Sequence, residues 1–218
     1  MKLHVKKTTN LKFRKPFLHS EIGSAMPNFK KIIYLSLGLL LTLGVSATAQ
    51  VKVGDQAPDF TVEGLDGKAV QLSSLKGKPV VLEWTNPECP FVRKQYDSGK
   101  MQALQKKYSK DVVWVTIASS ASGKQGFHSA AEWKEIVKKE KAAAAHLVLD
   151  PEGKIGRLYG AKTTPHMFVI DKSGKVVYQG AIDDKKDTNY VDAALTSLKS
   201  GQKIAVTATQ PYGCGVKY

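Results

Sequence analysis

Residues 79–94 read PVVLEWTNPECPFVRK, and they combine the pattern of a strand with the start of a helix around one cysteine. Its first part, 79–84, is short, apolar and β-branched, which predicts a buried central strand. Pro90 suits the first position of a helix, because its fixed φ fits the helix and its missing N–H would have no partner there. Cys89 is therefore predicted at a strand-to-helix junction, where unpaired backbone N–H groups and the helix dipole favour a thiolate.

The sequence contains two cysteines, Cys89 and Cys214. Outside the cytoplasm two thiols tend to oxidise unless something reduces them, so they form either one permanent disulfide or one that cycles. Cys214 lies in the segment 209–218 (TQPYGCGVKY), where a proline and two flanking glycines predict a mobile or tightly turned tail that can reach a distant site. A free cysteine is commonly a small buried hydrophobe, but the position of Cys89 at a strand end favours a reactive thiol.

Residues 1–49 are predicted to be a leader rather than part of the fold. From Met26, two lysines precede an apolar run at 32–45 that ends in Ala47-Thr48-Ala49, which is the layout of a secretory signal peptide. The apolar run spans about 14 residues, fewer than the roughly 20 that a membrane-spanning helix needs, so cleavage is expected. We expect an exported protein of the periplasm or cell envelope, with one domain at 50–218 and membrane contact only through an uncleaved signal segment.

The charge of the chain does not point to a nucleic acid. The formal net charge is +14 at pH 7, and half of this excess lies in the predicted leader. The remainder has no concentrated Lys/Arg stripe with interleaved aromatic residues, so nucleic-acid binding is disfavoured and a solvated basic surface is expected.

The exported part alternates strands and helices. Apolar residues alternating around Asp66-Gly67 predict an N-terminal hairpin, and Ser129 with Glu132 forms a capping box that opens a helix running to about residue 141. The remaining predicted elements are a helix with apolar positions at 101, 104 and 108, strands at 111–118 and 147–149, a short helix at 155–159, a hairpin at 167–181 and a helix at 191–198 that stops at Gly201. This order predicts an α/β fold with a central mixed sheet covered by helices on both faces.

Three motifs occur in a recognisable order: residues 57–60 (APDF) with 75–78 (LKGK), residues 84–94, and residues 163–171 (TTPHMFVID). In this order and spacing they resemble the thioredoxin-like superfamily, specifically the redoxin branch that holds the alkyl hydroperoxide reductase and thiol-specific antioxidant proteins. The resemblance spans nearly all of the exported part. It implies a thioredoxin-like fold with an N-terminal β-hairpin extension and thiol chemistry without a bound organic cofactor.

The active-site motif departs from two better-known patterns. Thioredoxins carry Cys-x-x-Cys, but the second cysteine position here is Val92, so a local dithiol is impossible. Peroxiredoxins typically have a Thr three residues and a Pro seven residues before the reactive cysteine, and those positions are Asn86 and Leu82 here. The chain resembles the peroxiredoxin-like proteins with a single motif cysteine, which read Asn-x-x-Cys-Pro-Phe-Val.

The leading functional prediction is a peroxiredoxin-like thiol oxidoreductase. Cys89 would reduce a peroxide and become a sulfenic acid, Cys214 would resolve it as a Cys89–Cys214 disulfide, and an external thiol reductant such as a thioredoxin-like protein would reopen that bond. The alternative enzyme is a thiol–disulfide exchange protein that acts on protein disulfides. In either case the second sulfur comes from far along the chain.

Four further residues are predicted to position the substrate: Asn86, Arg93, Thr164 and Pro165. Arg93 lies one helical turn beyond Cys89, so it either contacts the thiolate or a bound peroxide, or lies on a solvated helix face. The resemblance implies that Pro165 follows a cis peptide bond and that Thr164 offers its backbone N–H and C=O to an incoming substrate.

Non-catalytic alternatives remain open at this point. A permanent Cys89–Cys214 disulfide would staple the tail to the domain and leave a recognition module. A copper site at Cys89, His166 and Cys214 would suit the soft sulfur ligands, but the Cys-x-x-x-Cys spacing of thioredoxin-fold copper chaperones is missing, so no metal is expected. His166 is better explained as a structural histidine, and Asp183-Asp184 as a turn.

Overall fold

The computed structural model describes residues 50–218. The predicted leader at 1–49, with its signal segment, lies outside the described residues. None of the helices within residues 50–218 combines the length and the apolar content that a membrane span requires.

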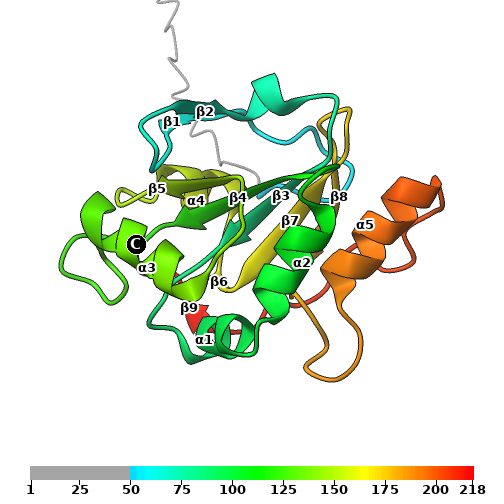
Figure 1. Cartoon of the computed structure of the whole chain (residues 1–218). Helices are drawn as coiled ribbons and strands as arrows, with labels where there is room; N and C mark the ends of the chain where they lie inside the picture. The colour runs from blue at the N-terminus through cyan, green and yellow to red at the C-terminus, as the bar shows by residue number, and fades with distance from the viewer. Residues whose placement is uncertain (1–49) are drawn as a thin grey trace, which may run out of the picture. The chain divides into compact units, whose positions relative to one another are not determined.

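A five-stranded mixed sheet forms the centre of the fold (Figure 1). Its middle strand is β3 (Val80–Trp84), which pairs in parallel with β4 (Val113–Ala118) and antiparallel with β7 (His166–Ile170). The strand β5 (His146–Leu149) extends the parallel side, and β8 (Val176–Gly180) extends the antiparallel side. Every residue of β3 is buried, as its apolar sequence predicts.

Helices and small elements surround this sheet. The helices are α1 (Pro90–Asp97), α2 (Lys100–Tyr108), α3 (Ala130–Glu140), α4 (Lys154–Tyr159) and α5 (Tyr190–Ser200). The N-terminal hairpin consists of β1 (Thr61–Glu63) and β2 (Ala69–Gln71), followed by a 3₁₀ turn at Leu72–Leu75. Two short strands, β6 (Thr163–Thr164) and β9 (Cys214–Gly215), form a separate antiparallel pair.

The two faces of the sheet bury separate apolar clusters, because side chains alternate along each strand. On one face Val81 of β3 packs with side chains of α1, α2 and α5, including Tyr96, Leu104 and Leu195. On the other face the neighbouring residues of β3 pack with α4 and the N-terminal hairpin. The predicted α/β architecture, with a mixed sheet covered on both faces and an N-terminal hairpin, is therefore confirmed.

Two details show how local sequence sets the element boundaries. The Ser129–Glu132 capping box forms as predicted: the Ser129 hydroxyl accepts from the Glu132 N–H at 3.3 Å, and the Glu132 carboxylate accepts from the Ser129 N–H at 2.7 Å. The helical segment after Pro90 is divided into α1 and α2, because Gly99 adopts a left-handed conformation with φ 73° between them.

Candidate functional site

Cys89 lies where the sequence predicts it, between β3 and α1. It is the N-cap residue of α1, with extended backbone angles, and Pro90 follows at the first helical position. Its N–H donates to the Asn86 carbonyl at 3.0 Å, and its own carbonyl accepts from the Arg93 N–H at 2.8 Å. The side chain is fully buried, so the sulfur meets protein atoms rather than solvent.

The sulfur of Cys89 faces the segment that contains the cis-proline. The Thr164–Pro165 peptide bond is cis, as the resemblance implies. In its protonated form the Cys89 thiol donates to the Thr164 carbonyl, whose oxygen lies 3.0 Å from Sγ. The two segments are 75 residues apart in sequence and meet at one end of the central sheet.

The second cysteine is carried to the same place by β9. Thr164 of β6 pairs with Cys214 of β9, and Thr163 pairs with Gly215, in antiparallel register. Figure 1 shows β9 beside β6 and close to the start of α1. Cys89 and Cys214 are both free thiols, and Cys214 packs against the apolar cluster that contains Cys89. The structure therefore brings together Cys89, Cys214, Thr164 and Pro165.

The segment around Cys214 differs from the mobile or tightly turned tail that its glycines and proline predict. It is an extended strand because its backbone pairs with β6. Gly213 makes this pairing possible: its φ is 138°, and a Cβ at this position would overlap the Thr164 carbonyl oxygen. At Gly215, two positions further along, a Cβ would have nothing within 4 Å.

Hydrogen bonding shifts the pKa values of the two cysteines in opposite directions. Burial opposes ionisation of Cys89, but hydrogen bonds from the Cys214 thiol and the Thr164 side chain outweigh it and hold the pKa of Cys89 below its ordinary value. Burial, followed by the hydrogen bond to Cys89 and its charge, raises the pKa of Cys214 to about 11. Cys89 is therefore the sulfur that ionises first, and Cys214 is the thiol that donates to it.

Replacing Cys214 by Ala or by Ser should separate the hydrogen bond from the sulfur chemistry. Cys214→Ala removes the donor, so we expect the pKa of Cys89 to rise. Cys214→Ser keeps an O–H donor in the same place, so the pKa of Cys89 should stay closer to that of the reduced wild type. Titration of the thiolate absorbance measures both. Equal pKa values in the two variants would contradict the assigned role of the donor.

Two of the predicted positioning residues are bonded within the protein. The buried Asn86 side chain accepts from the Glu88 N–H at 2.9 Å and donates to the Gln125 carbonyl at 3.2 Å, so it braces the loop before Cys89. The Arg93 guanidinium donates to Glu140 at 2.8 Å and also to Asp97. The partners of Arg93 are thus carboxylates of α1 and α3. The sequence suggests either contact with the thiolate or a bound peroxide, or a solvated helix face, and the ion pairs are a third arrangement.

His166 and Val92 have structural environments. His166 is buried, its Nδ1 accepts from the Lys162 N–H at 3.3 Å, and burial lowers its pKa to about 4. Val92, at the missing cysteine position, packs in the same apolar cluster as Cys89. Among the described residues, no group of three or more His, Cys, Asp or Glu side chains could hold a metal ion.

A buried carboxyl network beside the site was missed by the sequence reasoning. Glu83 of β3 is fully buried and accepts from Trp114 Nε1 at 2.7 Å, Tyr96 Oη at 2.9 Å and Gln105 Nε2 at 3.2 Å. Burial raises the pKa of Glu83 to about 7, although these hydrogen bonds partly lower it. The available signal was a glutamate inside the apolar run PVVLEW.

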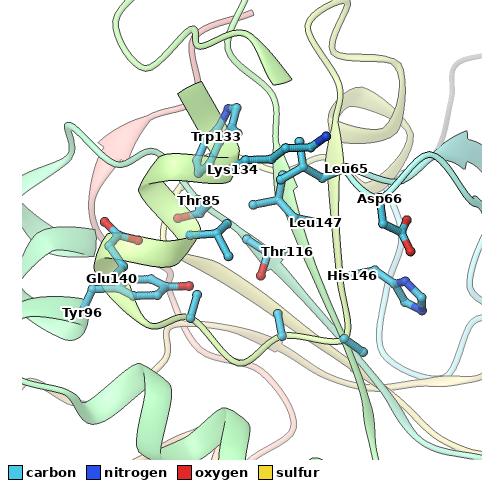
Figure 2. Close-up of a pocket in the computed structure, with 14 residues that line it drawn as sticks. Leu65, Asp66, Thr85, Tyr96, Thr116, Trp133, Lys134, Glu140, His146 and Leu147 are labelled. Atoms are coloured by element: carbon cyan, nitrogen blue, oxygen red, sulfur yellow. The ribbon is translucent and has the colours of Figure 1, made fainter. Parts of the chain in front are cut away.

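A cavity of about 300 Å³ lies between α3 and the strands β4 and β5 (Figure 2). Tyr96 and Glu140 lie together at one end of it, and Asp66 and His146 lie at the other. Neither Cys89 nor Cys214 is among its lining residues. This cavity and the two sulfurs are therefore separate features.

The chain is similar in sequence to several known proteins. The family model described as Redoxin matches residues 52–195. The thiol-disulfide oxidoreductase ResA of Bacillus cereus is 31% identical over 156 residues, covering 69% of this chain and 85% of the relative. The chloroplastic peroxiredoxin Q of Suaeda salsa is 28% identical over 174 residues, covering 71% of each.

A solved structure also shares the architecture. The crystal structure of an uncharacterized conserved protein from Geobacillus kaustophilus matches with a TM-score of 0.70 and 25% identity, covering 78% of this chain and 94% of that chain. This likeness extends over most of the residues that the structure describes.

Proposed function

Since the chain belongs to the Redoxin family, we propose that it is a thiol–disulfide oxidoreductase with Cys89 and Cys214 as its redox pair. The observation that carries the proposal is that Cys214 of β9 pairs with Thr164 of β6, whose carbonyl oxygen lies 3.0 Å from Cys89 Sγ at the start of α1. Several relatives are named thiol-disulfide oxidoreductases, which favours exchange with protein disulfides over the peroxide reduction that the sequence motif first suggested.

Each cysteine has one step in the exchange. The Cys89 thiolate attacks one sulfur of a substrate disulfide, forming a mixed disulfide and releasing the other substrate sulfur as a thiolate. Cys214 then loses its proton to solvent and attacks Cys89 Sγ, which forms the Cys89–Cys214 disulfide and releases the second substrate thiolate. The substrate gains two electrons and the protein loses two, and an external dithiol returns them.

The site supports these roles through its protein environment. The hydrogen bonds around Cys89 favour its thiolate, which is the form that attacks. The high pKa of Cys214 keeps it protonated until the charge on Cys89 has been consumed by the first step. Release of that charge removes one cause of the raised pKa, so Cys214 becomes easier to ionise when its turn comes.

Peroxide reduction is the second candidate function. It is favoured by the single cysteine of the active-site motif and by the similarity to peroxiredoxin Q. In this case Cys89 would attack the peroxide oxygen, release water or alcohol and become a sulfenic acid, and Cys214 would form the same disulfide with loss of water. The two candidates differ in the oxidant and share the product.

The location of the protein is part of the proposal. An exported oxidoreductase fits the signal-peptide layout of residues 26–49, and it fits a compartment in which disulfide substrates persist. The external reductant would then be a thioredoxin-like dithiol protein of the same compartment.

The test is to mix the reduced protein with an equimolar amount of either insulin, as a protein disulfide, or hydrogen peroxide. The reaction is quenched with acid, free thiols are alkylated, and disulfides are mapped by mass spectrometry. We expect insulin to produce the Cys89–Cys214 disulfide in wild type and a mixed disulfide on Cys89 in Cys214→Ser. If insulin leaves both cysteines reduced while peroxide oxidises them, the second candidate replaces the first.

A further inference from the structure

We propose that residues 207–218, here called the strap, occupy the docking edge of β6 as an internal substitute for a substrate segment. An external substrate must displace the strap before it can reach Cys89. The inference rests on the proposed function and names the class of substrate segment: an extended strand with a cysteine preceded by glycine. Three features of the structure carry it.

The first feature is the burial of the attacking sulfur. Cys89 has no exposed surface, and Cys214 of the strap packs against the apolar cluster that contains it and pairs with Thr164, whose carbonyl oxygen lies 3.0 Å from Cys89 Sγ. A thiolate must approach a disulfide sulfur at bonding distance, so a protein disulfide cannot react with Cys89 in this conformation. Since the strap lies along the backbone of Thr164, which contacts the sulfur, moving the strap exposes the edge beside Cys89.

The second feature is that β9 of the strap occupies the hydrogen-bonding edge of β6. Thr163 and Thr164 pair with Gly215 and Cys214 along one edge of β6. One edge of a strand carries one row of hydrogen-bonding groups, so it pairs with one partner at a time. A substrate segment that adds to this edge must replace β9, and in doing so it puts its own cysteine where Cys214 lies.

The third feature is how the strap is held. At its start, Thr207 and Thr209 pair with Gln179 of β8 through two backbone hydrogen bonds of 3.1 Å. At its other end, the Tyr218 hydroxyl donates to the Ala161 carbonyl at 2.9 Å, and the ring lies 4.7 Å from the Arg157 guanidinium carbon. The strap is thus attached on both sides of Cys214.

No residue of the strap is fully buried. A segment held by backbone pairing and partly exposed side chains opens at a lower free energy than one held in a core. The start of the strap can therefore stay on β8 while the part from Gly213 onward leaves β6. When the strap closes onto β6 again, Cys214 returns to Cys89 for the second step of the exchange.

The strap also indicates which segments fit the edge. The residue before Cys214 is Gly213, and a side chain there would overlap the Thr164 carbonyl oxygen. A substrate strand in the same register faces the same oxygen. We therefore expect a peptide that reads Gly-Cys-Gly to dock better than one that reads Val-Cys-Gly.

The test compares two glycines of the strap. All proteins carry Cys214→Ser, so that the strap has no sulfur and the hydroxyl beside Cys89 is constant. Gly213→Ala should lift the strap from β6, whereas Gly215→Ala adds the same methyl group where nothing lies within 4 Å. The probes are short peptides with a central Gly-Cys-Gly or Val-Cys-Gly, each activated as a thiopyridyl disulfide, and the release of thiopyridone gives the rate of attack by Cys89.

We expect Gly213→Ala to react with the Gly-Cys-Gly peptide at least about tenfold faster than Gly215→Ala, because the docking edge is vacant for a larger fraction of the time. The preference for Gly-Cys-Gly over Val-Cys-Gly should persist in Gly213→Ala. Exposure of Cys89 by general unfolding would remove that preference, so a fast reaction without it would overturn the inference. Equal rates in the two glycine variants would overturn it as well.

A second variant acts at the far end of the strap. If Gly213→Ala does not fold, Gly156→Ala replaces it, because its Cβ would overlap the Tyr218 hydroxyl and push that end of the strap away without touching β6. Failure of the proposed function has a different signature: no variant, including the Cys214→Ser parent, would react with either peptide. Exchange that occurs but ignores the strap would reject this inference alone.

Discussion

Cys89→Ser is expected to abolish the oxidation of an excess of dithiol by insulin, lowering the rate at least about a thousandfold. A serine hydroxyl in the place of the sulfur cannot form a disulfide, and its pKa is far too high for it to replace a thiolate as nucleophile. Turnover is measured by the consumption of dithiol at saturating insulin. The variant should otherwise keep its fold, since serine is close to cysteine in size.

Cys214→Ser is the matched control for this result. Without Cys214 the mixed disulfide is no longer resolved within the protein, so turnover by that route should stop. Cys89 should still attack the insulin disulfide, and the mixed disulfide on Cys89 should accumulate. The assignment of roles would be reversed if Cys89→Ser accumulated a mixed disulfide on Cys214 and Cys214→Ser did not react. The pKa of Cys214, raised to about 11, argues for the order proposed here.

The local parts of this site could be predicted from sequence. The strand at Val80–Trp84 and the helix start at Pro90 depend on residues within a few positions of one another, and both follow from composition and φ restriction. The cis peptide before Pro165 came from the resemblance to a family rather than from a physical rule. The predicted architecture was correct because strands and helices alternate so regularly.

The long-range parts could not be predicted. The pairing of β9 with β6 depends on a contact across 50 residues, and the composition of the tail suggested mobility rather than a strand. The partner of Arg93 on α3, Glu140, depends on helix packing that no local pattern encodes. The single motif cysteine is compatible with both peroxide and protein disulfide as substrate, so the motif alone does not distinguish them.

Glu83 is expected to make folding stability depend on pH. Its carboxyl loses its proton near pH 4.5 in the unfolded chain but only near pH 7 in the folded protein, so the folded state holds the proton more tightly. The stabilisation from the neutral carboxyl is complete below the unfolded pKa and is lost as the pH rises through the folded pKa. This difference in pKa corresponds to a loss on the order of 3 kcal/mol.

Glu83→Gln isolates this contribution. His166 works in the opposite direction, because its lowered pKa makes the folded state gain stability as the pH rises through about 4 to the ordinary histidine range. We therefore compare wild type with Glu83→Gln by urea unfolding at about pH 4 and about pH 8, since His166 contributes equally to both proteins. Relative to wild type, the glutamine variant should gain on the order of 3 kcal/mol between the two pH values. A constant difference would show that folding leaves the pKa of Glu83 unchanged.

The absence of a cysteine at Val92 has a consequence for the whole chain. When two cysteines lie three positions apart, their disulfide closes a very small ring and leaves the remaining polypeptide unconstrained. Here the Cys89–Cys214 bond would close a ring of about 125 residues, and chain-entropy arithmetic assigns such a ring about 5 kcal/mol of stabilisation against unfolding. Each catalytic cycle would then form and break a covalent ring that contains most of the domain. The redox state of the two sulfurs and the free energy of unfolding are therefore thermodynamically linked.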